Sequence, residues 1–162
     1  METVFGLAGS HWALFGAGLA FIGGAIGSSM AIAYVANVAA GVIAEDSEKF
    51  GRVLPLVAMP GTQGIYGFIT AFMVWIFFIQ EPKLLDNPQV GFQVFFACLP
   101  VAFGCLFSGI YQGVAGTGAA ALVGKQPESS GRALILPALV ETYAVLALIV
   151  SVLLLLTISG RL

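Results

Sequence analysis

Charged residues are scarce in this sequence. Lys, Arg, Asp and Glu together make up 9% of its 162 residues, whereas a soluble domain usually carries about 25%. This scarcity excludes an ordinary soluble fold. The net charge of −2 is also too small to attract an anionic polymer, so we expect no nucleic-acid partner.

The sequence has equally few residues of the kinds that form disulfides or bind transition metals, namely two cysteines and one histidine. Cys98 and Cys105 fall in one expected helix, about 10 Å apart along its axis, which is too far for a disulfide within the chain. We interpret both as small apolar residues. His11 lies at the expected start of the first helix, where we interpret it as a boundary residue rather than a ligand.

Hydrophobic residues, by contrast, make up 59% of the chain. Four apolar stretches are each longer than the roughly 20 residues that a helix needs to cross a bilayer. They lie at about 11–44, 52–80, 91–124 and 131–159. We therefore predict an all-α membrane protein with four transmembrane helices. The first and third stretches are rich in glycine, alanine and serine, which allow helices to approach closely.

The two halves of the sequence align without a gap when one is displaced by 80 residues. The matching pairs include Phe15 with Phe95, Gly24 with Gly104, Ser28 with Ser108, and Arg52 with Arg132. We predict two tandem helical hairpins, residues 1–80 and residues 81–162. Two helices per repeat give both hairpins the same direction through the membrane, unlike the inverted repeats of many transporters. Such a unit is suited to lateral repetition around a ring.

The basic residues predict the orientation of these hairpins. Four of them flank the loops inside the two hairpins, namely Lys49, Arg52, Lys125 and Arg132. Only Lys83 and Arg161 lie at the opposite surface. Because basic residues are enriched on the cytoplasmic side, we expect cytoplasmic hairpin loops and both termini outside.

One carboxylate, Glu141, lies deep in the fourth apolar stretch. In a helix, the nearest charged residues in the sequence, Arg132 and Arg161, are about 13 and 30 Å away. A charge in the hydrocarbon layer costs several kcal/mol, so an intramembrane acid indicates a functional site. In the repeat Glu141 aligns with Gly61, and the chain therefore carries one such acid per four helices.

Other polar side chains are expected at the depth of Glu141. They are Thr62, Gln63, Tyr66 and Gln112. Pro60 is expected to kink its helix and free a carbonyl group near Leu56. These oxygens could ligate a hard cation together with the carboxylate. Alternatively, the acid takes up a proton, and the polar side chains only form hydrogen bonds between helices. The residues alone leave both interpretations open.

Three segments carry a resemblance to a known family. They are Pro60-Gly-Thr-Gln-Gly-Ile-Tyr66, Ile110-Tyr-Gln-Gly113 and Val140-Glu-Thr-Tyr143. On a tandem repeat of hairpins, they resemble the proteolipid (c or K) subunit of V-type ATPases in its duplicated four-helix form. The pattern is most like the bacterial sodium-translocating type.

The resemblance implies a rotor ring of identical subunits in a membrane, which we expect to be a bacterial cell (inner) membrane. Each subunit would carry one Na⁺ or H⁺ on its carboxylate and exchange it beside a stator subunit that bears an essential Arg. Central-stalk subunits would meet the cytoplasmic hairpin loops. The chain itself would be non-catalytic, with the ATP chemistry on other subunits.

The resemblance also implies a set of ion ligands. Carried over by position, these are the backbone carbonyl of Met59 and the side chains of Thr62, Gln63, Gln112 and Glu141, with Tyr66 as a supporting residue. Every side chain of the sodium pattern is present, which favours Na⁺ as the bound ion.

The sequence leaves three alternatives to a sodium-carrying rotor subunit. The first keeps the rotor but makes H⁺ the coupling ion. The second is a standalone proton-coupled transporter, which the parallel repeat and the lack of a substrate-sized aromatic cavity disfavour. The third is a purely structural or channel-forming subunit, which would leave Glu141 unexplained.

Overall fold

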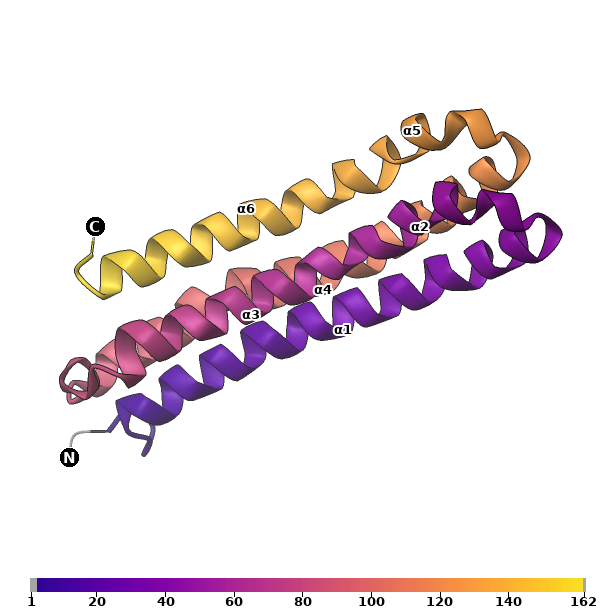
Figure 1. Ribbon diagram of the computed structural model, residues 1–162. Helices are drawn as coiled ribbons and strands as arrows, with labels where there is room; N and C mark the ends of the chain where they lie inside the picture. The colour runs from indigo at the N-terminus through magenta and orange to yellow at the C-terminus, as the bar shows by residue number, and fades with distance from the viewer. Residues whose placement is uncertain (1–2, 162) are drawn as a thin grey trace.

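The computed structural model describes residues 3–161 as four long helical rods that lie side by side (Figure 1). The first turn of α1 and the last turn of the fourth rod lie at one end of the bundle, and the loops inside the two hairpins lie at the other (Figure 1). Within these residues, four segments are long and apolar enough to cross a membrane. They are Gly9–Glu45, Ser47–Ile79, Pro88–Lys125 and Pro127–Ile158. The prediction of an all-α membrane protein with four spans in two tandem hairpins is confirmed.

The first and third rods are continuous, whereas the second and fourth are built from shorter pieces. The continuous rods are α1 (Gly9–Glu45) and α4 (Pro88–Lys125). The second rod comprises η1 (Ser47–Lys49), α2 (Phe50–Ala58), η2 (Met59–Gly61), α3 (Thr62–Val74) and η3 (Trp75–Ile79). After η4 (Pro82–Leu85) and α4, the fourth comprises η5 (Pro127–Ser129), α5 (Ser130–Ala133) and α6 (Ile135–Ile158).

The break in the second rod lies at Pro60, as the sequence predicts. Proline has no N–H to donate, and the chain tightens there into the short 3₁₀ turn η2. Ser28 of α1 inserts its hydroxyl group at this point. Its Oγ donates to the Pro60 carbonyl at 2.6 Å and accepts from the Gly64 N–H at 2.8 Å. One side chain thus satisfies two backbone groups that pair with each other in a regular α-helix.

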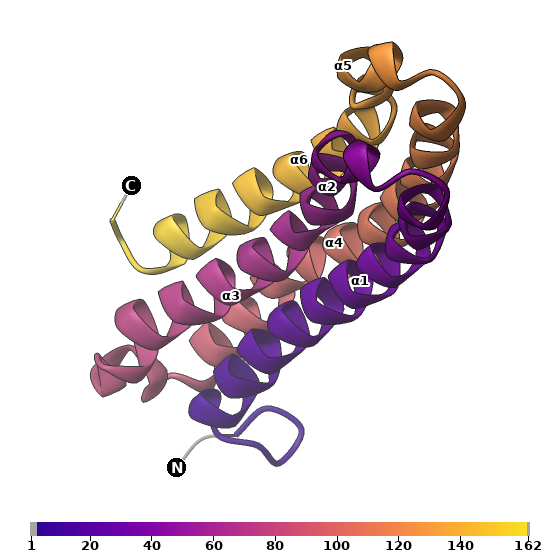
Figure 2. The same cartoon turned by 45° about the vertical axis from the view of Figure 1, so that its right-hand side comes forward.

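The two hairpins meet chiefly along α1 and α4, while α3 packs on α1 and α6 packs on α4. Figure 2 shows α3 and α4 between α1 and α6. Glycine makes the central contact unusually close. A Cβ atom on Gly27 would lie 2.5 Å from the Cys105 carbonyl oxygen, and one on Gly109 would lie 2.6 Å from the Gly27 carbonyl carbon. The glycines and alanines of these helices therefore bring the two backbones into direct contact.

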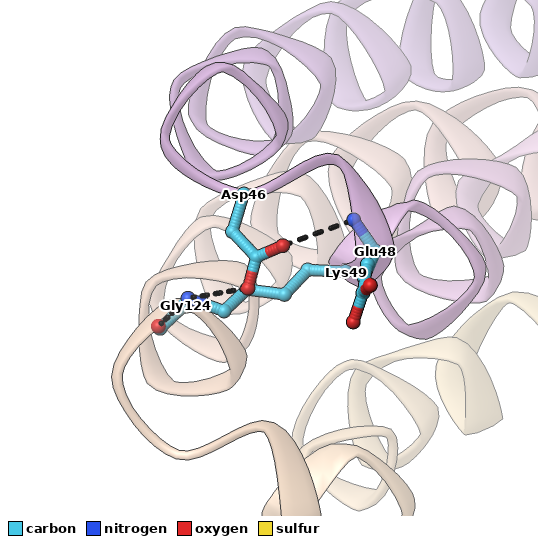
Figure 3. A network of polar contacts seen from close by, with 4 residues as sticks. All are labelled: Asp46, Glu48, Lys49 and Gly124. Carbon is cyan, nitrogen blue, oxygen red and sulfur yellow. Dashed lines mark hydrogen bonds and ion pairs between the residues drawn. The ribbon is translucent and has the colours of Figure 1, made fainter.

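A polar contact joins the hairpins at the loop end (Figure 3). Lys49 donates from Nζ to the Gly124 carbonyl at 3.0 Å, and Nζ lies 3.7 Å from Asp46 Oδ2. Asp46 Oδ1 in turn accepts from the Glu48 N–H at 3.0 Å. The carbonyl groups in the last turn of a helix lack partners within the helix. Lys49 satisfies one of them at the end of α4 and fixes the first loop against the second hairpin.

We predict that Gly27→Ala destabilises the packing of the two hairpins. The added methyl group has no room against the backbone of α4, and overpacking of this kind costs about 1–3 kcal/mol. Thermal unfolding of the detergent-solubilised protein measures the effect. Gly41→Ala is the matched control, because a Cβ atom on Gly41, in the same helix, would meet nothing within 4 Å and alanine favours helix. Equal unfolding temperatures for the two variants would contradict the close contact.

Candidate functional site

Three helices place the predicted polar residues at one level of the bundle. Thr62, Gln63 and Tyr66 lie in the first turns of α3, directly after the break at Pro60. Gln112 lies in α4 and Glu141 in α6. The side chains of Gln63 and Gln112 are fully buried, whereas Glu141 is half-buried.

The Glu141 carboxylate accepts one hydrogen bond on each oxygen. Tyr66 donates from its hydroxyl group to Oε1 at 3.1 Å, and Gln112 donates from Nε2 to Oε2 at 3.3 Å. The donors come from α3 and α4, so the acid on α6 is fixed by both neighbouring helices. The Thr70 hydroxyl bonds the backbone carbonyl of Tyr66 at 3.0 Å, one turn further along α3.

A chain of polar contacts continues from Gln112 away from the acid. Gln63 donates from Nε2 to Gln112 Oε1. The Thr62 hydroxyl lies 3.4 Å from Gln63 Oε1 and 3.2 Å from the Met59 carbonyl oxygen, and these two acceptors share its single hydrogen. All five residues assigned as ion ligands on the resemblance therefore belong to one connected group, from the Met59 carbonyl to Glu141.

The electrostatics of this group rest on one charge and several neutral dipoles. Within residues 3–161, Lys49 with Asp46 is the only ion pair, and Glu141 has no basic partner. Every buried side-chain nitrogen or oxygen in that range has a hydrogen-bond partner. Neutral donors stabilise a carboxylate but do not cancel its charge, so in hydrocarbon the group needs a proton or a cation to become neutral.

A serine hydroxyl fixes the backbone beside the acid. Ser108 of α4 donates from Oγ to the carbonyl of Val140, the residue before Glu141, at 2.9 Å. The repeat relates this bond to the one between Ser28 and the Pro60 carbonyl. Sequence reasoning matched the two serines but gave them no role. The repeat places the two serines at equal positions, but a helix that is apolar on every side does not show which neighbour each serine faces.

Several polar residues near the acid in sequence do not join the group. The Thr142 hydroxyl bonds the Leu139 carbonyl of its own helix at 2.7 Å, and the Tyr143 side chain is 69% exposed. His11 is exposed in the first turn of α1, which is consistent with a boundary residue. Cys98 and Cys105 are buried free thiols, in agreement with the expected absence of a disulfide between them.

The acid borders an open hollow on the outside of the bundle. The hollow has a volume of about 350 Å³ and is lined by Glu141 with Ala138, Thr142, Val145 and Leu146. The buried glutamines close the site on the inner side. An ion or proton on the carboxylate would therefore leave toward the hollow, past the apolar side chains of α6.

Comparison with known proteins finds one family that matches each half of the chain separately. The family of the ATP synthase C subunit matches residues 15–74 and again residues 95–154, two ranges displaced by 80 residues. The V-type sodium ATPase subunit K of Enterococcus hirae is 36% identical over 148 residues, which cover 91% of this chain and 92% of that protein. The A-type ATP synthase subunit K of Methanocaldococcus jannaschii is 32% identical over 154 residues, 93% of this chain and 66% of that protein.

We predict that Gln112→Ala destabilises the protein by about 1–3 kcal/mol, because it leaves Gln63 Nε2 and Glu141 Oε2 without their partners. Thermal unfolding in detergent measures the loss. Gln93→Ala is the matched control, since Gln93 is an exposed glutamine of the same helix. The double variant with Gln63→Leu and Gln112→Leu should lose less than the sum of the two single leucine variants. Strict additivity would show that the two glutamines do not interact.

Proposed function

The chain belongs to the family of the ATP synthase C subunit as a duplicated V-type proteolipid, and from this premise we propose that each copy carries one Na⁺ at Glu141. It is an integral membrane rotor subunit of a V- or A-type ATPase. Identical copies form its ring, and residues 1–80 and 81–162 are its two hairpin units. The chain performs no ATP chemistry, which lies on other subunits.

The connected group of oxygens from Met59 to Glu141 is the observation that carries the choice of Na⁺. It offers one backbone carbonyl, one hydroxyl, two amide oxygens and one carboxylate, which are the ligand types that hard cations prefer. A monovalent cation with one carboxylate gives a neutral site. A divalent cation would leave one positive charge in the hydrocarbon layer, at a cost of several kcal/mol.

Cation binding requires these oxygens to turn from one another toward the ion. An amide oxygen has two lone pairs, and a hydroxyl group can rotate its hydrogen outward. Gln63 and Gln112 therefore keep a hydrogen-bond partner while each contributes an oxygen. Tyr66 donates to the carboxylate from the side facing α3, and this bond orders the acid for the ion.

The half-exposed position of Glu141 suits loading and release at a stator. While the acid faces lipid, its charge is cancelled by the bound ion, and rotation meets no barrier from an exposed charge. Beside a stator arginine, the guanidinium group attracts the carboxylate and the ion leaves through the hollow along α6. The switch is thus the occupancy of Glu141.

A proton is the second candidate for the coupling ion, and one observation favours it. The buried glutamines already have hydrogen-bond partners within the polar group, so a proton on a free lone pair of the Glu141 carboxylate would not require them to turn. In that case the glutamines connect helices, and the rotor function remains.

Basic residues support an orientation for the subunit. The loop end of the bundle carries Lys49, Arg52, Lys125 and Arg132. We place this end in the cytoplasm, where the central stalk meets the ring, and both termini outside. The membrane is a bacterial cell membrane, in line with the Enterococcus relative.

Carbodiimide labelling of Glu141 in purified rings tests the choice of ion. The reagent couples to a protonated carboxyl group, so a bound cation protects the acid. At fixed pH we expect the labelling rate to fall as the Na⁺ concentration is raised and to be unaffected by the K⁺ concentration. Glu141→Gln should abolish the labelling and thereby identify its site. A rate that depends on pH but not on Na⁺ would establish H⁺ as the ion.

Two threonines provide a matched comparison in the same assay. Thr62→Val removes a proposed ligand oxygen without changing the size of the side chain, and should raise the Na⁺ concentration for half-protection about tenfold or more. Thr142→Val removes a hydroxyl group next to Glu141 that bonds only its own helix. Its protection by Na⁺ should equal that of the natural protein. Equal behaviour of the two variants would remove Thr62 from the ligand set.

Thiol labelling tests the orientation. Glu128 and Asp86 are exposed acids at opposite ends of the bundle. A reagent that cannot cross the membrane should modify Asp86→Cys in intact cells and Glu128→Cys only in inverted vesicles. The two natural cysteines are buried and should not react. The reverse pattern would place the hairpin loops outside.

A further inference from the structure

The face formed by α4 and α6 carries two apolar grooves. One has a volume of about 460 Å³ and is lined by Phe103, Phe107, Tyr111 and Tyr143, among others. The other has a volume of about 580 Å³ and lies nearer the termini, between Phe96 and the last turns of α6. Exposed apolar side chains are ordinary in a membrane protein, but grooves of this size need something to fill them.

The internal repeat shows what covers the matching positions on the first hairpin. It relates Phe103 to Gly23, Phe107 to Gly27 and Tyr111 to Ala31. These three small residues are buried, and all of them lie against α4 of the second hairpin. The positions that line an open groove on the second hairpin are therefore covered by a packed helix, α4, on the first hairpin.

The residues of α4 that make this contact have counterparts of their own. Ala102 lies against Gly23, Leu106 against Gly27 and Gly113 against Ala31. The same displacement relates them to Ile22, Ile26 and Ala33. All three of these α1 residues are exposed, and helix geometry places them about 120° around α1 from the side that meets α4. The chain thus presents both halves of a second contact, on opposite edges.

We propose that the α4–α6 face of one copy receives the outer edge of α1 from a second copy of this chain, with Phe103 against Ile22, Phe107 against Ile26 and Tyr111 against Ala33. The inference rests on the proposed ring and names the surfaces that close it. Joining two different edges of identical copies is a head-to-tail contact, and such contacts generate rings when their rotation closes.

The side chains at the two kinds of contact differ in size. Within a copy, glycine lets α1 and α4 touch through their backbones. Between copies, Phe103, Phe107 and Tyr111 replace those two glycines and the alanine; isoleucines face the two phenylalanines, and Ala33 faces the tyrosine. The helix pair between copies is therefore more widely spaced than the pair within a copy, and close and wide spacings alternate around the ring.

The arrangement covers one side of α6 and leaves the Glu141 side open. Tyr143 lines the covered groove. The hollow beside Glu141 is bordered by Thr142 and Val145, which correspond to Thr62 and Ile65. Thr62 and Ile65 remain at least partly exposed on the first hairpin although the second hairpin packs against it. The second copy therefore leaves the carboxylate accessible from the lipid side.

Cross-linking in native membranes tests the contact. In a chain with Cys98→Ala and Cys105→Ala, the pair Ile26→Cys and Phe107→Cys should give a ladder of covalent oligomers with a short thiol-to-thiol cross-linker. The control pair is Ile149→Cys with Phe107→Cys. Ile149 and its counterpart Ile69 are both exposed, so Ile149 should face lipid in the ring, and this pair should remain monomeric.

The outcomes separate this inference from the rotor proposal. A ladder from the first pair alone supports the contact. Intact rings that give no ladder from the first pair, or an equal ladder from the control pair, overturn the assigned surfaces while the rotor proposal stands. A protein that is monomeric before any cross-linking overturns both.

Alanine substitutions give a second readout that needs no cysteine. Ile26 and Ile149 are isoleucines with exposed fractions of 44% and 48% in the single copy. If Ile26 becomes buried between copies, Ile26→Ala should lower the temperature at which detergent-solubilised rings dissociate, and Ile149→Ala should leave it unchanged. Equal dissociation temperatures would overturn the contact even where the cross-linker fails to reach.

Discussion

No water is available in the hydrocarbon layer to solvate a carboxylate or an amide, so Glu141 must find its partners inside the protein. Tyr66 and Gln112 supply them from two other helices, and Gln112 requires Gln63 in turn. One acid thus imposes polar residues on three helices at a common depth. None of them is charged, which leaves the acid neutral only when it holds an ion or a proton.

Close packing of the backbones lets short side chains complete this group. Because Gly27 and Gly109 bring α1 and α4 into contact, the flanking helices α3 and α6 also lie near the centre of the bundle. Ser28 then reaches the carbonyl of Pro60, and Ser108 reaches the carbonyl before Glu141. A bulkier residue at either glycine would separate the helices that carry these partners. The polar group therefore depends on the close packing of the glycines, although the two sets of residues lie in different parts of the sequence.

The spans, the repeat and the depth of the site residues could be predicted because each depends on position along a helix. Rise per residue places Gln63, Gln112 and Glu141 at one level. Rotation about the helix axis was not predictable, because a membrane helix that is apolar on every side has no pattern to show which face meets which neighbour. For that reason the hydrogen bonds that Ser28 and Ser108 donate to carbonyl groups of neighbouring helices were missed.

Duplication explains why the two hairpins are alike in backbone and different in chemistry. Both keep a serine that bonds a carbonyl of the neighbouring helix, but the position of Glu141 is Gly61 in the first hairpin. A ring of single hairpins would have identical contacts throughout, whereas joining two in one chain allows the contact within a copy to diverge from the contact between copies. It also halves the number of acids for a given number of helices. With fewer ions moved per turn, the free energy of each turn is divided among fewer ions, and each can be driven against a steeper gradient.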